Sequence, residues 1–148
     1  MQTAFTLNGA QVAADAPPGA LLLDTLRNQL GQTAARHGCG EEQCGACMVL
    51  LDGAAIHACG RETASIAGRA ITTADAVNPA IPAAFLAEQA GQCGYCLSGM
   101  VIAAAALLAG NPRPNRADIA IALDGNLCRC GSHNRIIAAI MRAAESAP

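Results

Sequence analysis

The sequence contains no tryptophan, two phenylalanines and one tyrosine, so aromatic residues make up only 2% of the chain. Large buried rings, which dominate many protein cores, cannot supply the packing here. Alanine, leucine, isoleucine and valine must supply it instead, within a chain of 148 residues. Small domains with cores of this kind usually need an added constraint, such as a bound metal or disulfide bonds.

Positive charge is also sparse. The chain has no lysine, and its nine basic residues are all arginines, which are scattered without a run and leave a net charge of -2. Proteins that bind nucleic acid usually gather basic side chains on one face or along one helix. The charge distribution therefore argues against nucleic acid as a partner.

Long apolar runs are missing as well. The longest uninterrupted run, 100–109, has about half of the roughly 20 residues that a membrane-spanning helix needs, so we expect no transmembrane segment. The first residues, MQTAFTLNGAQV, have no basic start, no extended apolar stretch and no twin arginine, and they do not resemble an export signal. We therefore expect a cytoplasmic protein.

Cysteine, in contrast, is abundant, with eight residues in the chain. Thiols are kept reduced in the cytosol, where closely spaced cysteines are more often metal ligands or catalytic groups than disulfide partners. Without an export signal, metal binding is the leading interpretation even before the spacing is considered.

The first half of the sequence has the pattern of a small α+β domain. Apolar and polar residues alternate on both sides of Asn8-Gly9, a pair favoured in the turns of β-hairpins. Leu22, Leu23, Leu26 and Leu30 have helical spacing. Further short strands are expected at 48–51, 55–58 and 71–73.

The second half, from residue 78 onward, has a helical pattern. Helices are expected at 81–91, 98–110, 116–123 and 134–144. Ser98, Asn115 and Ser132 are candidate N-caps for the last three of these helices. Residues 99–109 are apolar on every side, so we expect this segment to be buried by its neighbours rather than exposed on a surface.

The first cysteine set follows the spacing Cys39-x4-Cys44-x2-Cys47, with Cys59 after a short hairpin. This is the plant-type spacing for a [2Fe-2S] cluster. The glycines at positions 38, 40 and 45 suit it, because a loop around a cluster must approach closely and adopt positive φ angles. Zinc is the alternative, but zinc sites generally combine short cysteine pairs from two places, whereas three of these thiols lie in one loop.

The second set consists of Cys93-x2-Cys96 and Cys128-x-Cys130 in the helical half. Two pairs of cysteines allow either zinc or a second cluster, although the single residue between Cys128 and Cys130 is short for a zinc site. Two four-thiolate clusters in one small chain would indicate electron transfer rather than catalysis at iron, because each set would fill its cluster's ligand positions.

Three motifs carry a family resemblance: HGCGEEQCGACMVLLDG, QCGYCLSGM and GNLCRCGSHNRI, which together contain all eight cysteines. In this order and with these separations, the chain resembles the small iron–sulfur subunit of the molybdenum hydroxylases, the family of xanthine dehydrogenase and aldehyde oxidoreductase. The resemblance implies a β-grasp ferredoxin-like domain at 1–76 and a four-helix bundle at 77–148. Each would hold one [2Fe-2S] cluster.

The resemblance also implies a route for electrons. They would pass from a molybdenum-pterin cofactor on a large partner subunit to the cluster of the helical domain, then to the ferredoxin-like cluster, and on to a flavin (FAD) subunit or a c-type cytochrome. Gln92 and Cys130 correspond to the family positions that approach the pterin. Leu97-Ser98-Gly99 and Ser132-His133 resemble the branch that acts on nicotinate, isoquinoline and related N-heteroaromatic compounds, or on aldehydes.

Two other functions remain as alternatives to this interpretation. A free-standing two-cluster ferredoxin is one, although a diffusing carrier would not need the helical half. A structural zinc or disulfide protein is the other. The sequence has no G-x-G-x-x-G motif and no evident general base or nucleophile. We therefore expect no FAD site, no NAD site and no catalytic residue in this chain.

Overall fold

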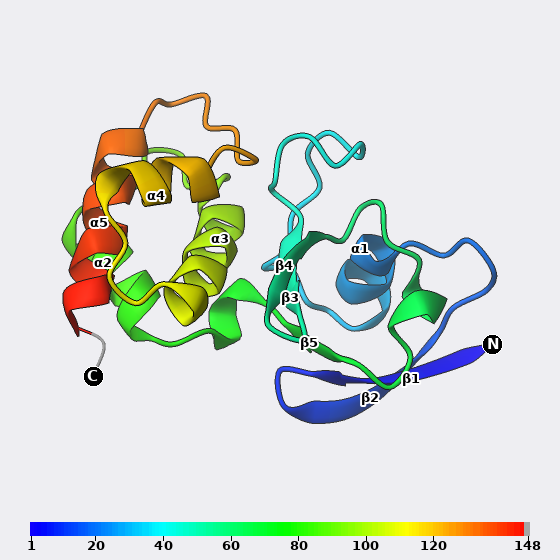
Figure 1. The fold of residues 1–148 in the computed structure, drawn as a ribbon. Helices are drawn as coiled ribbons and strands as arrows, with labels where there is room; N and C mark the ends of the chain where they lie inside the picture. The colour runs from blue at the N-terminus through cyan, green and yellow to red at the C-terminus, as the bar shows by residue number, and fades with distance from the viewer. Residues whose placement is uncertain (147–148) are drawn as a thin grey trace.

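The computed structural model describes residues 1–146, and its N-terminal half is built on a mixed five-stranded sheet (Figure 1). The strand order is β2-β1-β5-β3-β4, with β1 parallel to β5 and the other pairs antiparallel. The strands are β1 (Gln2–Leu7), β2 (Ala10–Asp15), β3 (Met48–Leu51), β4 (Ala54–His57) and β5 (Ala70–Thr72). Asn8 and Gly9 both have positive φ, as the predicted hairpin turn requires.

The leucine-rich segment forms a helix, but it is shorter and less regular than its spacing predicts. Helix α1 (Leu22–Asp24) continues directly as a π-helical turn, η1 (Thr25–Gln29), in which the N–H of Leu30 donates to the carbonyl of Thr25. Leu22, Leu23 and Leu26 are buried against the sheet, whereas Leu30 is only partly covered. Two short 3-10 turns, η2 (Thr63–Ile66) and η3 (Ala74–Ala76), complete this half.

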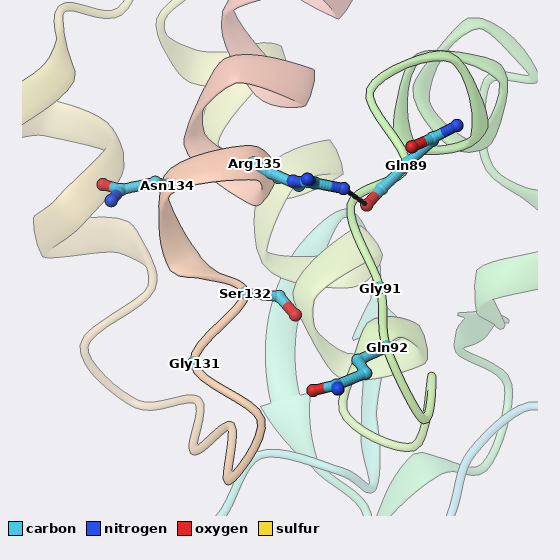
Figure 2. Close-up of a pocket in the computed structure, with 7 residues that line it drawn as sticks. All are labelled: Gln89, Gly91, Gln92, Gly131, Ser132, Asn134 and Arg135. Carbon is cyan, nitrogen blue, oxygen red and sulfur yellow. Dashed lines mark hydrogen bonds between the residues drawn. The ribbon is translucent and has the colours of Figure 1, made fainter.

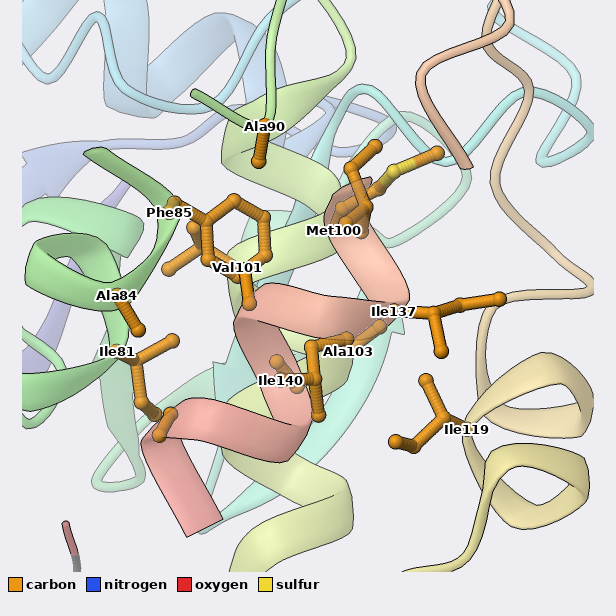
Figure 3. Packing of buried hydrophobic residues seen from close by; sticks show 14 of the residues in the cluster. Ile81, Ala84, Phe85, Ala90, Met100, Val101, Ala103, Ile119, Ile137 and Ile140 are labelled. Carbon is orange, nitrogen blue, oxygen red and sulfur yellow. The ribbon is translucent and has the colours of Figure 1, made fainter. Parts of the chain in front are cut away.

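The C-terminal half contains four helices that share one hydrophobic core. They are α2 (Ala80–Ala87), α3 (Leu97–Gly110), α4 (Arg116–Ala122) and α5 (His133–Ser146). Figure 3 shows how side chains from all four helices meet, with Phe85, Met100, Ile119 and Ile140 among them. A separate core lies between the sheet and α1, so each half packs around its own buried residues.

The predicted end of α2 and the predicted cap of α3 differ from the structure. Helix α2 ends at Ala87 rather than residue 91, because Gln89 adopts a left-handed φ of 48° and the N–H of Ala90 bonds back to the carbonyl of Phe85. Ser98 is not an N-cap, because α3 begins one residue earlier and the buried Ser98 hydroxyl has no partner among the described residues.

The predicted cap of α4 is confirmed, whereas the predicted burial of residues 99–109 holds only for the first part of that segment. Asn115 caps α4 in a reciprocal pair with Asp118, and Ser132 directly precedes α5. The first seven residues after Leu97 in α3 are buried, while the end of the helix emerges to the surface. Among residues 1–146, no helix combines the length and apolar character that crossing a membrane requires.

The start of α3 brings the two halves into contact. This helix packs against β3 and β4, and its Gly99 meets the cysteine-containing loop that precedes β3. A Cβ atom at Gly99 would lie 2.0 Å from the carbonyl oxygen of Gly45. A side chain of any size at position 99 would therefore push the helical half away from this loop.

We expect Gly99→Ala to lower the free energy of unfolding by about 2–3 kcal/mol, because the added methyl group overpacks a backbone contact that cannot yield. Gly110→Ala is the matched control in the same helix, since a Cβ there has open space, and it should be neutral or slightly stabilising. Urea unfolding followed by circular dichroism measures both. Equal midpoints for the two variants would contradict the proposed tight contact.

Candidate metal centres

The first cysteine set surrounds the loop that leads into β3. Cys47 directly precedes β3 and Cys59 lies just after β4, so the antiparallel pairing of Met48 with His57 brings these two buried thiols together. Cys39 and Cys44 lie on the loop itself, with Cys39 exposed and Cys44 partly covered. The β3–β4 hairpin thus supplies one side of the site and the loop supplies the other.

Backbone N–H groups of this loop point at the sulfur atoms. The N–H groups of Glu41, Gln43 and Cys44 donate to Cys39 Sγ at 3.3, 3.2 and 3.3 Å. Two further bonds run from Glu42 to Cys59 Sγ at 3.4 Å and from Cys39 to Cys44 Sγ at 3.3 Å. Donors in this arrangement stabilise negative charge on sulfur, which is what a thiolate-bound cluster needs.

The loop reaches this shape through positive φ angles at Gly40 (70°), Glu42 (58°) and Gly45 (77°). Glycine adopts this conformation without strain, whereas Glu42 does so at a cost. The backbone strain at Glu42 is offset by a hydrogen bond, because the Glu42 N–H donates to Cys59 Sγ. The predicted role of the glycines at 40 and 45 is therefore confirmed in its backbone geometry.

The thiols of this set differ strongly in acidity. The N–H groups of Glu41, Gln43 and Cys44 lower the pKa of Cys39 to about 7. Burial raises the pKa of Cys47 to about 12, against a smaller opposing effect of the N–H of Cys59. Without a bound cation, negative charge is therefore favoured at the loop and disfavoured next to the core.

The second cysteine set joins two segments that are far apart in the sequence. Cys93 and Cys96 lie on the turn before α3, and Cys128 and Cys130 lie on the loop between α4 and α5. The thiols of Cys93 and Cys130 interact, and so do those of Cys96 and Cys128. Each of these interactions thus links one segment to the other.

In the second set, as in the first, an exposed thiol has a lowered pKa and a more buried thiol has a raised pKa. The N–H of Tyr95, 3.5 Å from Cys93 Sγ, lowers the pKa of Cys93, and the Cys130 thiol adds to the effect. Burial raises the pKa of Cys96 to about 12, with a further contribution from Cys128. Burial also opposes ionisation of Cys128, but the N–H groups of residues 130–132 and the Cys96 thiol together outweigh it and lower that pKa.

Thiols of the same set influence one another's acidity. Cys44 acts on Cys39 and Cys59 acts on Cys47, while Cys93 is affected by Cys130 and Cys128, and Cys96 by Cys128 and Cys93. Within residues 1–146, no three His, Cys, Asp or Glu side chains are arranged to hold one metal ion. Two pairs of thiols in each set, with N–H donors to their sulfurs, fit a two-iron cluster with four cysteine ligands.

The two sets are close neighbours. A cavity of about 220 Å³ is lined by Cys93, Cys96 and Cys128 and also by Gly38 and Cys44 of the first loop. The N–H of Leu127, the residue before Cys128, donates to the carbonyl of Cys44 at 3.0 Å. One backbone hydrogen bond therefore connects the loops of the two sites.

Gln92 and Cys130, the positions expected to face a pterin, are both exposed at the same end of the helical half. Gln92 lines an open cavity of about 450 Å³ (Figure 2). The other lining residues come from the end of α2 and the start of α5: Gln89, Gly91, Gly131, Ser132, Asn134 and Arg135. This cavity adjoins the second cysteine set, because Gln92 precedes Cys93 and Gly131 follows Cys130.

Comparison with known proteins agrees with both sites. The model of the "2Fe-2S iron-sulfur cluster binding domain" matches residues 5–73, and that of the "[2Fe-2S] binding domain" matches residues 69–141. The chain is 44% identical to a nicotinate dehydrogenase subunit of Pseudomonas putida, over 99% of this chain and 98% of that one. It is 43% identical to the alpha subunit of isoquinoline 1-oxidoreductase of Brevundimonas diminuta, over 97% of each chain.

Solved structures agree as well. Quinoline 2-oxidoreductase from Pseudomonas putida 86 contains a chain with a TM-score of 0.94 and 34% identity, which covers 99% of this chain and 94% of that one. The chain belongs to the iron–sulfur subunits of the molybdenum hydroxylases. It is thus the iron–sulfur subunit of an oxidoreductase, as its cysteine motifs indicate.

Sequence patterns did not single out several residues that shape these iron–sulfur sites. The buried Asn126 lies against Gly45 and Gly99 and donates from Nδ2 to Met48 Sδ at 3.4 Å. Arg36 and Tyr95 connect the two cysteine loops through hydrogen bonds. Tyr95 lies between Cys93 and Cys96 in the sequence, and Asn126 lies shortly before Cys128. These positions beside cysteines could have drawn attention to both residues, but their spacing does not predict what they contact.

The pKa differences predict an order of thiol reactivity in the iron-free chain. The thiolate is the reactive form, so at pH 7 about half of Cys39 should be reactive while Cys47 and Cys96 remain protonated. We expect iodoacetamide to modify Cys39 well before Cys47 or Cys96, with a rate that rises through a midpoint near pH 7. Peptide mass spectrometry after timed quenching measures the order.

Unfolding supplies the control, because in concentrated urea the thiols should react at similar rates. Equal rates for Cys39 and Cys47 in the absence of urea would contradict the loop geometry described for Cys39.

Proposed function

We propose that this chain is a two-cluster electron relay in a molybdenum hydroxylase. In this proposal Cys39, Cys44, Cys47 and Cys59 bind one [2Fe-2S] cluster, and Cys93, Cys96, Cys128 and Cys130 bind the other. Each cluster accepts and returns one electron. The chain itself holds the two clusters in fixed positions, and it contributes no catalytic residue to the substrate reaction.

The reaction on the partner would be hydroxylation with water as the oxygen source. A ring carbon loses a hydrogen and gains a hydroxyl group, R–H + H2O → R–OH + 2 H⁺ + 2 e⁻, and the two electrons leave one at a time through this chain. N-heteroaromatic compounds are the proposed substrate class. Support comes from relatives named for nicotinate and isoquinoline, which are 44% and 43% identical to this chain, while relatives named for aldehydes are 36% identical or less.

The hydrogen bond from Leu127 to Cys44 is the observation that carries the relay proposal. Cys44 belongs to the first site, and Leu127 is bonded covalently to Cys128 of the second. Between the Cα atoms of Cys44 and Cys128, a path therefore crosses only backbone atoms and one N–H···O contact of 3.0 Å. A protein that used its two sites independently would have no need of this connection.

The partner would be a large subunit that binds the molybdenum-pterin cofactor beside Gln92 and Cys130. Exposure of both residues and the open cavity next to Gln92 support this position. Further support comes from the aldehyde oxidoreductase of Desulfovibrio desulfuricans, in which a matching region with a TM-score of 0.93 makes up only 17% of a much longer chain. There, the equivalent of this chain is covalently joined to a large remainder.

The finer details of the architecture belong to the same proposal. We assign a β-grasp ferredoxin-like domain to 1–76 and a four-helix bundle to 77–148, on the basis of the two separate cores. Electrons would leave from the ferredoxin-like cluster to an FAD subunit or a c-type cytochrome.

Serine variants of one cysteine from each site test the assignment of ligands. In reduced unsubstituted protein, electron paramagnetic resonance should show two rhombic signals. Cys96→Ser should remove one signal and Cys59→Ser the other, because each site has four ligands of its own. Loss of both signals from a folded Cys96→Ser protein, or a colourless unsubstituted protein, would contradict the proposal.

Purification from the native host tests the partner. Affinity-tagged chain should copurify with a large subunit, and the complex should contain about four iron atoms per molybdenum, as two [2Fe-2S] clusters require. Elemental analysis of the purified complex gives this ratio. Iron-loaded protein that remains alone and molybdenum-free would instead indicate the free-standing ferredoxin.

A further inference from the structure

The side chain of Arg36 crosses from the first half of the molecule to the second. Its Nη1 donates to the carbonyl of Gly94 at 2.6 Å and to that of Tyr95 at 3.1 Å. The guanidinium also lies over the Tyr95 ring, 5.3 Å from the centroid. Both carbonyls belong to the turn between Cys93 and Cys96, so this arginine from the first half holds the turn that carries two thiols of the second.

Tyr95 makes the reverse connection. Its hydroxyl donates to the carbonyl of His37, which lies two residues before Cys39, while its N–H points at Cys93 Sγ. The ring also lines the cavity that Cys93, Cys96 and Cys128 surround. Because 49% of Tyr95 is exposed, burial of the ring in a hydrophobic core does not account for this arrangement.

The backbone of Arg36 is fixed as well. Its N–H donates to the carbonyl of Ala46 at 3.0 Å, across the base of the first cysteine loop. Arg36 forms no salt bridge with a carboxylate in residues 1–146. Its positive charge is therefore directed at the Cys93–Cys96 turn and is not neutralised there by an acidic side chain.

We propose that Arg36 and Tyr95 form a clamp that positions the Cys93–Cys96 turn and raises the reduction potential of the cluster in the helical half. This inference rests on the proposed function, because it requires a cluster at the second site. Reduction adds one negative charge to a cluster, and a nearby guanidinium favours the reduced form. The guanidinium bonds to two carbonyls of the Cys93–Cys96 turn, and within residues 1–146 it makes no hydrogen bond to the first cysteine loop, so the effect on the first cluster should be smaller.

The effect of the Arg36 charge is tested by measuring the reduction potentials of both clusters in the cluster-loaded full chain. Arg36→Met keeps most of the side-chain length and removes the charge. It should make reduction of the second cluster about tenfold less favourable, which is about 59 mV for one electron, and should shift the first cluster less. Arg36→Lys should recover at least half of the shift, because it retains the charge while losing the planar fork. Redox titration followed by electron paramagnetic resonance separates the two clusters.

Positioning is tested by hydrogen exchange in the segment 91–97. Tyr95→Phe removes the hydroxyl bond to His37 but no charge, so it should leave both potentials nearly unchanged and speed exchange of this segment. Arg36→Met should speed exchange as well. Arg113→Met is the matched control, since Arg113 follows the far end of α3 and its side chain makes no hydrogen bond within residues 1–146. It should change neither measurement.

The outcomes separate this inference from the proposed function. If unsubstituted protein lacks two [2Fe-2S] signals, the proposed function fails. If both signals are present but Arg36→Met shifts the two clusters equally, or no more than Arg113→Met does, the electrostatic role of the clamp is wrong while the relay stands. Exchange in 91–97 that is the same in Tyr95→Phe and unsubstituted protein would overturn the positioning role.

Discussion

The close approach of two backbones, at Gly45 and Gly99, is the constraint on which the arrangement of both iron–sulfur sites depends. Because Gly99 has no Cβ, the start of α3 can lie directly on the first cysteine loop. A Cβ at this position would lie 2.0 Å from the carbonyl oxygen of Gly45. Cys96 stands at the N-terminal end of this helix and Cys44 beside Gly45, and both line one cavity. A larger residue at position 99 would separate the two sites by the width of a side chain.

Both sites handle negative charge in the same way. In each, exposed loop thiols receive backbone N–H groups that favour the thiolate, while a thiol next to the core is held protonated by burial in the absence of iron. Iron binding must therefore supply the free energy that ionises Cys47 and Cys96. The backbone N–H groups of the loops lower the corresponding cost at Cys39 and Cys93. The shared pattern arises in unrelated surroundings, a β-hairpin in one site and two helix starts in the other.

The sequence was sufficient to predict most of the secondary structure. Strand alternation and the Asn8-Gly9 pair predicted the hairpin, and helical periodicity located α2 to α5. Errors occurred where tertiary contacts decide local structure. Leu22, Leu26 and Leu30 predicted a regular helix, but a π-helical turn widens it after Asp24. Ser98 has the chemistry of a cap, but α3 already begins at Leu97 and Ser98 is buried in the first turn, beside the Gly99 that meets Gly45.

The contacts between the two loops were the least predictable feature. Residues 36 and 95 are 59 positions apart, and no periodicity relates them. The link between Leu127 and Cys44 has a consequence for synthesis of the chain. The ribosome releases the first loop before α3 and the α4–α5 loop have been made, and domains generally fold as units from the N-terminal side. The surface that receives Gly99 and Leu127 is therefore present when these residues emerge, and the later site is assembled on the earlier one as its template.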